Sequence, residues 1–260
     1  MVKRYRWQAS ILALAVMGVS ACGSDEVAPN PPPIGTPSPS PPPTLTLAFD
    51  FADNAAGWES GFAEYGTNQD EDDFEFESGL ANVPANVNEQ GFLMQSHNRS
   101  DDVLMYLSSA VSGLEPSRSY RVEATLSFAT NVPTGCFGIG GSPGDSVYIK
   151  AGANNEPVER SVENFSGFPS YAVNIDHGNQ SQSGNEAIVI GTYAQSMPTG
   201  GNCTSSNPYS IKVLSTEGEG PIVTADSEGR LYPFFASDSG FEGVTRMYWL
   251  EGEFSFVPIE

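Results

Sequence analysis

Residues 120–128 have the sequence Tyr-Arg-Val-Glu-Ala-Thr-Leu-Ser-Phe, in which every second residue is apolar. Side chains of a β-strand point alternately to its two faces, so this period of two predicts a strand with one buried and one wet face. Residues 45–51 alternate in the same way, with Leu45, Leu47, Phe49 and Phe51 on one face. Both segments indicate β-structure, since neither fits the period of a helix.

Shorter strands are predicted along the rest of the chain, at residues 74–80, 103–107, 146–150, 171–175, 187–191, 209–214, 231–236 and 246–257. Turn-rich pieces at residues 154–155, 183–185 and 227–229 separate them, and no sustained helical period occurs after residue 45. Many short strands joined by Gly, Asn and Asp turns are typical of an all-β protein. We therefore predict an antiparallel β-sandwich of jelly-roll type, formed by one domain.

The N-terminus carries a basic tip, Lys3, Arg4 and Arg6, then an apolar run at residues 11–17 that is too short for a permanent membrane helix. The following residues are Val19-Ser20-Ala21-Cys22. This arrangement resembles the lipobox of bacterial lipoproteins. The resemblance implies removal of residues 1–21, a diacylglycerol on the Cys22 sulfur and a fatty acyl chain such as palmitate on the new amine. The alternatives are an ordinary secreted protein and a single membrane-anchoring helix.

The residue after Cys22 is Gly23. In the lipoprotein family an aspartate at this place tends to retain the protein at the inner membrane. For a bacterium with two membranes, the resemblance therefore implies anchoring at the outer membrane, with the domain outside the cytoplasm.

Residues 25–44 are rich in proline, serine and threonine and contain two triple-proline runs, at 31–33 and 41–43. Proline fixes φ and removes backbone donors, so such a segment forms a semi-rigid stalk rather than a core. The predicted organisation is a signal peptide (1–21), a lipidated cysteine with a proline-rich linker (22–44) and a β-sandwich domain (45–260). Docking of the proline segment into an aromatic groove is the alternative.

The sequence carries a net charge of −21, and only Lys3, Arg4 and Arg6 among its basic residues fall in residues 1–21. After processing, eight basic residues face 32 acidic residues, for a net charge of −24. Such a surface repels nucleic acid and anionic lipid headgroups, so neither is an expected partner. Solubility, cation binding and a saline habitat all remain compatible with it.

Cys136 and Cys203 remain once Cys22 is assigned to lipid. Outside the cytoplasm two such cysteines favour a disulfide, which would join two glycine-rich loops. The alternatives are two free thiols or a metal pair, although neither cysteine has a histidine close to it in sequence.

Residues 111–122 contain Gly113-Leu114, Pro116 and Tyr120, which resemble the Gly-Leu-x-Pro-x-x-x-Tyr approach to a central strand in carbohydrate-binding modules and fibronectin-like sandwiches. Jelly-roll binding modules also pair first and last strands, as the aromatic segments 49–58 and 248–256 suggest here. Residues 98–102 and 238–243 are similar to stretches of uncharacterised bacterial lipoproteins. The resemblance implies the fold and specifies no ligand.

Catalytic motifs are weak. Residues 140–144 match G-x-S-x-G around Ser142, but a nucleophile elbow needs a following helix, whereas residues 146–150 are predicted as a strand. The oxyanion hole would also lose a donor at Pro143. We assign no catalytic residue and favour a protein that is not an enzyme.

No cofactor is expected, with calcium left open. Residues 68–73 offer oxygen ligands, yet the sixth and twelfth positions of an EF-hand loop are Asp73 and Gly79 instead of Gly and Glu. A solvated acidic loop is favoured there. Calcium gathered from separate loops stays possible, so the metal ligands are unknown.

Two polar clusters lie beside predicted strand ends, at residues 96–102 and 176–181. Carboxylates, amides and an arginine near aromatic rings suit sugars, whose hydroxyls need hydrogen-bond partners and whose C–H faces stack on rings. The alternative is turn chemistry with a salt bridge from Arg99 to Asp101 or Asp102. The candidate ligand-binding residues are His97, Asn98, Arg99, Asp101, Asp102, Asp176, His177 and Asn179.

Three functions follow as hypotheses. The first is a lipid-anchored binding protein for a glycan or another envelope component, such as an envelope protein. The second is a jelly-roll enzyme acting on polysaccharide, a hydrolase or lyase, which an aromatic-lined groove beside a carboxylate pair would favour. The third is a structural or adhesion subunit, which a flat, featureless sheet would favour.

Overall fold

The computed structural model describes residues 43–84, 87, 89–165, 167–195, 203 and 207–259. These residues belong to one compact unit, Pro41–Glu260. The predicted signal peptide, Cys22 and all but the last residues of the proline-rich linker lie outside the described residues. Within the described ranges, no helix has both the length and the apolar character needed to cross a membrane.

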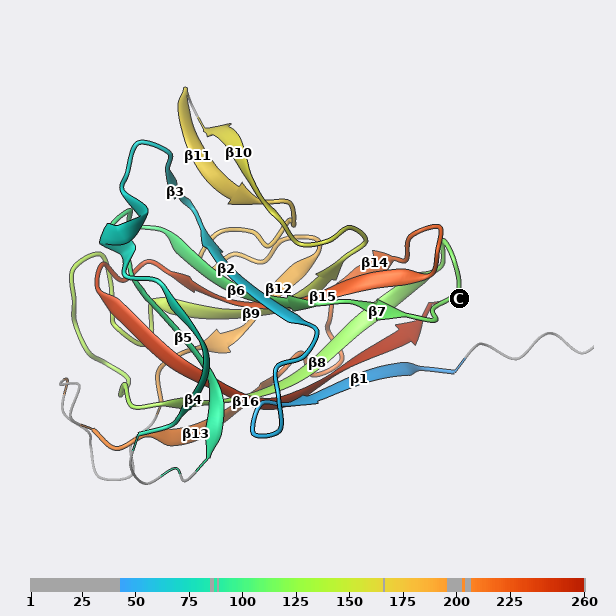
Figure 1. Ribbon diagram of the computed structural model, residues 1–260, viewed down its shortest axis with the longest axis horizontal. Helices are drawn as coiled ribbons and strands as arrows, with labels where there is room; N and C mark the ends of the chain where they lie inside the picture. The colour runs from blue at the N-terminus through green and yellow to red at the C-terminus, as the bar shows by residue number, and fades with distance from the viewer. Residues whose placement is uncertain are drawn as a thin grey trace, which may run out of the picture. The chain divides into compact units, whose positions relative to one another are not determined.

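The domain is an antiparallel β-sandwich of jelly-roll type, as the alternating pattern predicts (Figure 1). A seven-stranded sheet has the order β13 (Ser210–Ser215), β8 (Ser119–Thr130), β16 (Val244–Pro258), β5 (Gln90–His97) and β4 (Glu77–Asn82), with β1 (Leu45–Asp50) on β16 and β14 (Ile222–Thr224) on β8. A six-stranded sheet has the order β12 (Ala187–Thr192), β9 (Val147–Asn154), β15 (Arg230–Ser239), β6 (Val103–Ser109) and β2 (Trp58–Ala63), with β7 (Val111–Ser112) on β15. A small sheet joins β10 (Arg160–Phe165), β11 (Phe168–Val173) and β3 (Tyr65–Gly66).

The main core lies between the two large sheets. The apolar face predicted for residues 120–128 is buried in it, while Arg121, Glu123 and Thr125 point the other way. Phe235 of β15 is fully buried at the centre of an aromatic cluster. Its ring centroid lies 4.5, 5.1 and 5.5 Å from those of Trp249, Trp58 and Phe49.

The turn before β8 is fixed by Tyr120. Leu114 and Tyr120 are both buried in the core, and the Tyr120 hydroxyl accepts a hydrogen bond of 2.8 Å from the Glu115 backbone N–H. The resemblance of residues 111–122 to the approach to a sandwich strand therefore has a physical basis here, because the Tyr120 side chain hydrogen-bonds to the turn that precedes its own strand.

The six-stranded sheet buries part of its outer face as well. Phe234 and Ala236 of β15 and Leu104 of β6 form a second cluster with Val173, the last residue of β11, and Ile175, which follows it. The end of β11 and the segment after it therefore cover this face as a third layer. The hairpin of β10 and β11 projects from it (Figure 1).

The strand predicted at residues 74–80 differs from the structure. Residues Glu71–Phe74 form a single 3-10 turn, η1, and the strand β4 begins only at Glu77. Asp70 starts the turn because its carboxylate accepts a hydrogen bond from the Asp72 N–H. The acidic residues 70–73 are exposed, in agreement with the favoured interpretation as a solvated loop.

Cys136 and Cys203 form the predicted disulfide, with 5.5 Å between their Cα atoms. The bridge closes a long loop that contains β9 to β12. A cross-link of this length acts mainly by restricting the unfolded chain.

Replacing both cysteines by alanine should lower the free energy of unfolding by about 4 kcal/mol, the loop-entropy value for a bridge of this length. Urea denaturation followed by tryptophan fluorescence measures it. Wild-type protein unfolded in the presence of a reductant serves as the control and should show the same loss. An unchanged unfolding midpoint in both samples would contradict the prediction.

Candidate functional site

A cleft of about 850 Å³ lies under the β10–β11 hairpin. Its walls come from β3, β10 and β11, from the residues around Ser100 and Asp102, and from residues 174–179. Within the hairpin, Glu163, Phe165, Ser170 and Ala172 line the cleft. The chain thus places one face of an exposed hairpin over a polar floor.

The floor is fixed by a buried ion pair. Lys150 of β9 and Asp238 of β15 are both fully buried, and Lys150 Nζ lies 2.8 Å from Asp238 Oδ2. The ammonium also donates to the backbone carbonyls of His177 at 2.8 Å and Gln182 at 3.2 Å. One lysine therefore attaches the loop after β11 to two strands of the six-stranded sheet.

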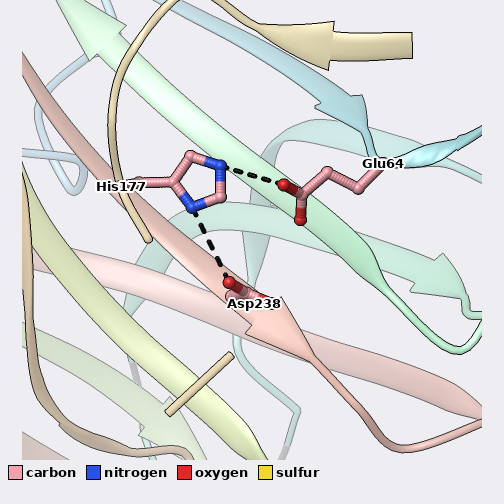
Figure 2. A group of neighbouring side chains, drawn as sticks. All are labelled: Glu64, His177 and Asp238. Carbon is pink, nitrogen blue, oxygen red and sulfur yellow. Dashed lines mark ion pairs between the residues drawn. The ribbon is translucent and has the colours of Figure 1, made fainter. Parts of the chain in front are cut away.

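His177 lies between two carboxylates, as Figure 2 shows. Its Nε2 is 3.0 Å from Glu64 Oε1, and its Nδ1 is 3.7 Å from Asp238 Oδ2 and 3.4 Å from Lys150 Nζ. The tautomer with the proton on Nε2 satisfies these contacts, because Nε2 donates to Glu64 and Nδ1 faces an ammonium donor.

The two predicted polar clusters meet at this cleft. Asn179 Nδ2 donates to Asp102 Oδ2 at 2.7 Å, and Gln180 Nε2 donates to the Asp101 carbonyl at 3.1 Å. Asp102, Asp176, His177 and Asn179 line the cleft.

Asn98 is part of the same network of hydrogen bonds. It is buried, its Nδ2 donates to the Ser239 carbonyl at 2.6 Å, and its Oδ1 accepts from the Ser100 N–H at 3.0 Å. Asn98 therefore holds the turn that carries Asp102.

The side chains of His97 and Arg99 contact Glu75 and not the cleft. His97 Nδ1 lies 3.3 Å from Glu75 Oε1, and Arg99 Nη2 lies 3.7 Å from the same oxygen. The salt bridge expected as the alternative, from Arg99 to Asp101 or Asp102, is replaced by this contact with Glu75. Neither His97 nor Arg99 lines the cleft.

Burial changes the pKa values of carboxyl groups that line the cleft. It raises the pKa of Asp102 to about 8, and the neighbouring carboxylates of Glu64 and Asp238 act in the same direction. Burial also raises the pKa of Glu64, against the hydrogen bond from His177. The exposed Asp176 differs, because hydrogen bonds, led by that from the Asn185 backbone, lower its pKa.

The loops of the site use special backbone conformations. Glu64 and Asp101 both have φ of 70°, in the left-handed region that few residues other than glycine adopt. Gly178 has φ of 73°, and a Cβ there would lie 2.2 Å from the Gln182 carbonyl oxygen. Glycine is therefore required beside His177.

Glu64, Lys150 and Asp238 were not singled out by the sequence. Lys150 alternates with Ile149 and Ala151, which favours a solvent-facing side chain. Asp238 lies between Ser237 and Ser239, at the polar end of its strand. The available signals were a lysine inside the apolar run of β9 and the scarcity of lysine, since Lys150 and Lys212 are the only lysines after residue 21.

Ser142 of the G-x-S-x-G match lies in a turn. Its Oγ donates to Asp145 Oδ2 at 3.0 Å and accepts from the Asp145 N–H at 3.1 Å. Strand β9 follows at Val147 instead of the helix that a nucleophile elbow requires.

No protein-family model matches the chain, and no curated protein matches it. Among solved structures, the enzymatically active domain of tailspike protein 4 of bacteriophage CBA120 aligns at 12% identity and a TM-score of 0.32, over 80% of this chain and 20% of that chain. The K1 cleaved adhesin domain of Lys-gingipain from Porphyromonas gingivalis W83 aligns at 9% identity and 0.34, over 81% and 97%. A carbohydrate-binding module of Caldicellulosiruptor saccharolyticus in complex with mannohexaose aligns at 10% identity and 0.33, over 80% and 96%.

Replacing Lys150 by methionine should lower the free energy of unfolding by about 3–5 kcal/mol, because Asp238 would keep a buried charge without its partner. Thermal and urea unfolding measure the loss.

The other lysine provides a matched control. Lys212 Nζ donates to the carbonyls of Thr192 at 2.7 Å and Ala194 at 2.5 Å, so Lys212→Met leaves no carboxylate unpaired. It should cost only about 1–2 kcal/mol. Equal losses for the two variants would show that the buried charge does not dominate.

Proposed function

We propose that this chain is a lipid-anchored protein outside the cytoplasm whose cleft binds a neutral glycan. The observation that carries the proposal is a pair of exposed aromatic rings at the tip of the hairpin that borders an acidic cleft. Phe165 and Phe168 are 55% and 74% exposed and lie opposite each other at the hairpin tip.

Hairpin geometry places both rings on one side. Residues paired directly across an antiparallel ladder point to the same face, and alternate residues share it. Phe165 shares its face with Glu163, and Phe168 shares its face with Ser170. Of these four, Glu163, Phe165 and Ser170 line the cleft. Rings in this place suit the C–H face of a sugar, with hydroxyls reaching the polar floor.

The floor offers hydrogen-bond acceptors. Asp176 lines the cleft and is exposed. Sugar hydroxyls are donors that can reach its carboxylate oxygens. The lining residues include four acidic side chains and, among those described, no lysine or arginine. An acidic cleft disfavours uronate polysaccharides and favours neutral or amino sugars.

A second candidate function is hydrolysis or cleavage of polysaccharide. One observation favours it: Glu64 and Asp102 both line the cleft beside an aromatic-bearing hairpin, and glycoside hydrolysis requires two carboxyl groups. Release of reducing ends from a bound glycan would distinguish the enzyme from a binding protein.

Phe165→Ala should weaken glycan binding about tenfold, because an aromatic stacking contact contributes about 1 kcal/mol or more. Isothermal titration with oligosaccharides of mannose, galactose, glucose and N-acetylglucosamine measures the affinity, with oligogalacturonate as the anionic comparison.

Val162→Ala is the matched control. Val162 lies on β10 and is 58% exposed, but its side chain points to the opposite face of the same hairpin. Binding should survive in this variant. Absence of binding to all neutral oligosaccharides, or equal weakening by both substitutions, would refute the glycan proposal.

Anchoring is proposed from the sequence around Cys22 alone. Cys22→Ser should abolish incorporation of labelled palmitate in cells and move the protein from the membrane fraction to the soluble fraction, because attachment would depend on the acyl chains. Cys136→Ser should leave the labelling unchanged. Persistent palmitate incorporation in Cys22→Ser would contradict lipidation at this residue.

A further inference from the structure

Two buried carboxylate oxygens at the floor of the cleft lack a hydrogen-bond donor. They are Asp102 Oδ1 and Asp238 Oδ1, and no residue that the structure describes donates to either of them. The other oxygen of each side chain has partners. Asp102 Oδ2 accepts from Asn179 Nδ2 at 2.7 Å. Asp238 Oδ2 accepts from Lys150 Nζ and from the Gln180 N–H, both at 2.8 Å. Bare buried acceptors are rare, because each one loses the hydrogen bonds that water would make.

The pairing of β6 with β15 places these two carboxyl groups beside each other. Asp102 directly precedes β6 and lies two residues before Leu104, whose partner across the ladder is Asp238. Residues two apart in an extended chain share a face of the sheet, so Asp102 and Asp238 are diagonal neighbours on one face. Their side chains lie within hydrogen-bonding reach of each other.

One proton satisfies both bare oxygens. Two ionised carboxylates that face each other can only accept hydrogen bonds, whereas a protonated carboxyl group donates to an ionised one. A hydrogen bond from O–H to a charged oxygen is also stronger than one between neutral groups.

The surroundings favour Asp102 as the protonated partner. Asp238 receives the Lys150 ammonium and a backbone N–H, which stabilise its charged form, whereas Asp102 receives one neutral amide. Burial, and then the charges of Glu64 and Asp238, raise the pKa of Asp102 to about 8, against the hydrogen bond from Asn179.

The charged and titratable groups around the pair come from three other parts of the chain. Glu64 follows β2, Lys150 lies on β9, and His177 belongs to the loop after β11. His177 Nε2 is 3.0 Å from Glu64 Oε1, and Nδ1 is 3.7 Å from Asp238 Oδ2. With the histidine neutral in its Nε2 tautomer, three carboxyl groups share one positive partner, Lys150, which favours a proton held among them.

We propose that Asp102 and Asp238 share one proton at neutral pH, and that this hydrogen bond fastens the turn before β6 to strand β15. The attachment is sensitive to pH, because ionisation of Asp102 replaces a hydrogen bond with repulsion between two buried charges. Asp102 also accepts the hydrogen bond from Asn179, so the same proton helps to hold the loop after β11 at the cleft.

The stability of the fold should therefore fall as pH rises. An aspartate of the unfolded chain ionises near about pH 4, whereas Asp102 of the folded protein keeps its proton up to about pH 8. Between these values the folded state binds a proton that the unfolded state has released, so each rise in pH favours unfolding. Above about pH 8 this contribution levels off.

Asp102→Asn tests the proposal in the full-length protein without any ligand. Asparagine can turn its amide donor toward Asp238 and its carbonyl toward Asn179, so it reproduces the protonated form and does not titrate. Between about pH 5 and about pH 9, the melting temperature of the wild type should fall by several degrees more than that of Asp102→Asn. The variant should melt at the higher temperature at the alkaline end.

Carbon-13 NMR of the wild type gives a second measurement that needs no variant to fold. The Asp102 carboxyl resonance, assigned through its own backbone, should titrate near pH 8. The resonance of an exposed aspartate such as Asp53 should titrate near about pH 4 in the same sample.

Glu163→Gln is the matched control, since it removes an acidic side chain that lines the same cleft from the exposed strand β10. Its melting temperature should depend on pH as that of the wild type does, because solvent screens an exposed carboxylate. The proposal is overturned when the Asp102 carboxyl group titrates in the ordinary aspartate range, or when Asp102→Asn keeps the wild-type dependence of melting temperature on pH.

Discussion

The Lys150 ammonium holds together the parts of the protein that form the site. It lies on β9, pairs with Asp238 on the neighbouring strand β15, and donates to the carbonyls of His177 and Gln182 in the covering loop. A buried ion pair adds little to stability by itself, but breaking one is severe. Here it acts as a positional constraint, because every cleft residue between 176 and 182 depends on where that loop is attached.

The acidic side chains of the chain lie in two different environments. Most acidic side chains are exposed and favour solubility, but Glu64, Asp102 and Asp238 lie in a partly dehydrated place where their charges interact strongly. A cleft of this kind attracts whatever brings donors or positive charge.

The period of two predicted the sandwich well, because burial between two sheets acts directly on alternate residues such as Val122 and Leu126. The two polar clusters around Asp102 and His177 could be recognised in the sequence, but their meeting could not be predicted, since it depends on how the strands of one sheet are ordered. Lys150 was missed for a related reason. The period of two shows which residues share a strand face. It does not show whether a third layer covers the outer face of the sheet.

The β10–β11 hairpin is exposed, yet contacts at its base hold it in place. Strand β10 is exposed at every position, so the hairpin gains little from burial and is held at its base. There Arg160 lies over the Tyr171 ring, with 4.3 Å from Cζ to the centroid, and pairs with Glu71 at 3.1 Å. Strand β3 adds backbone pairing to β11. These contacts at the base set where the exposed hairpin lies relative to the cleft that it lines.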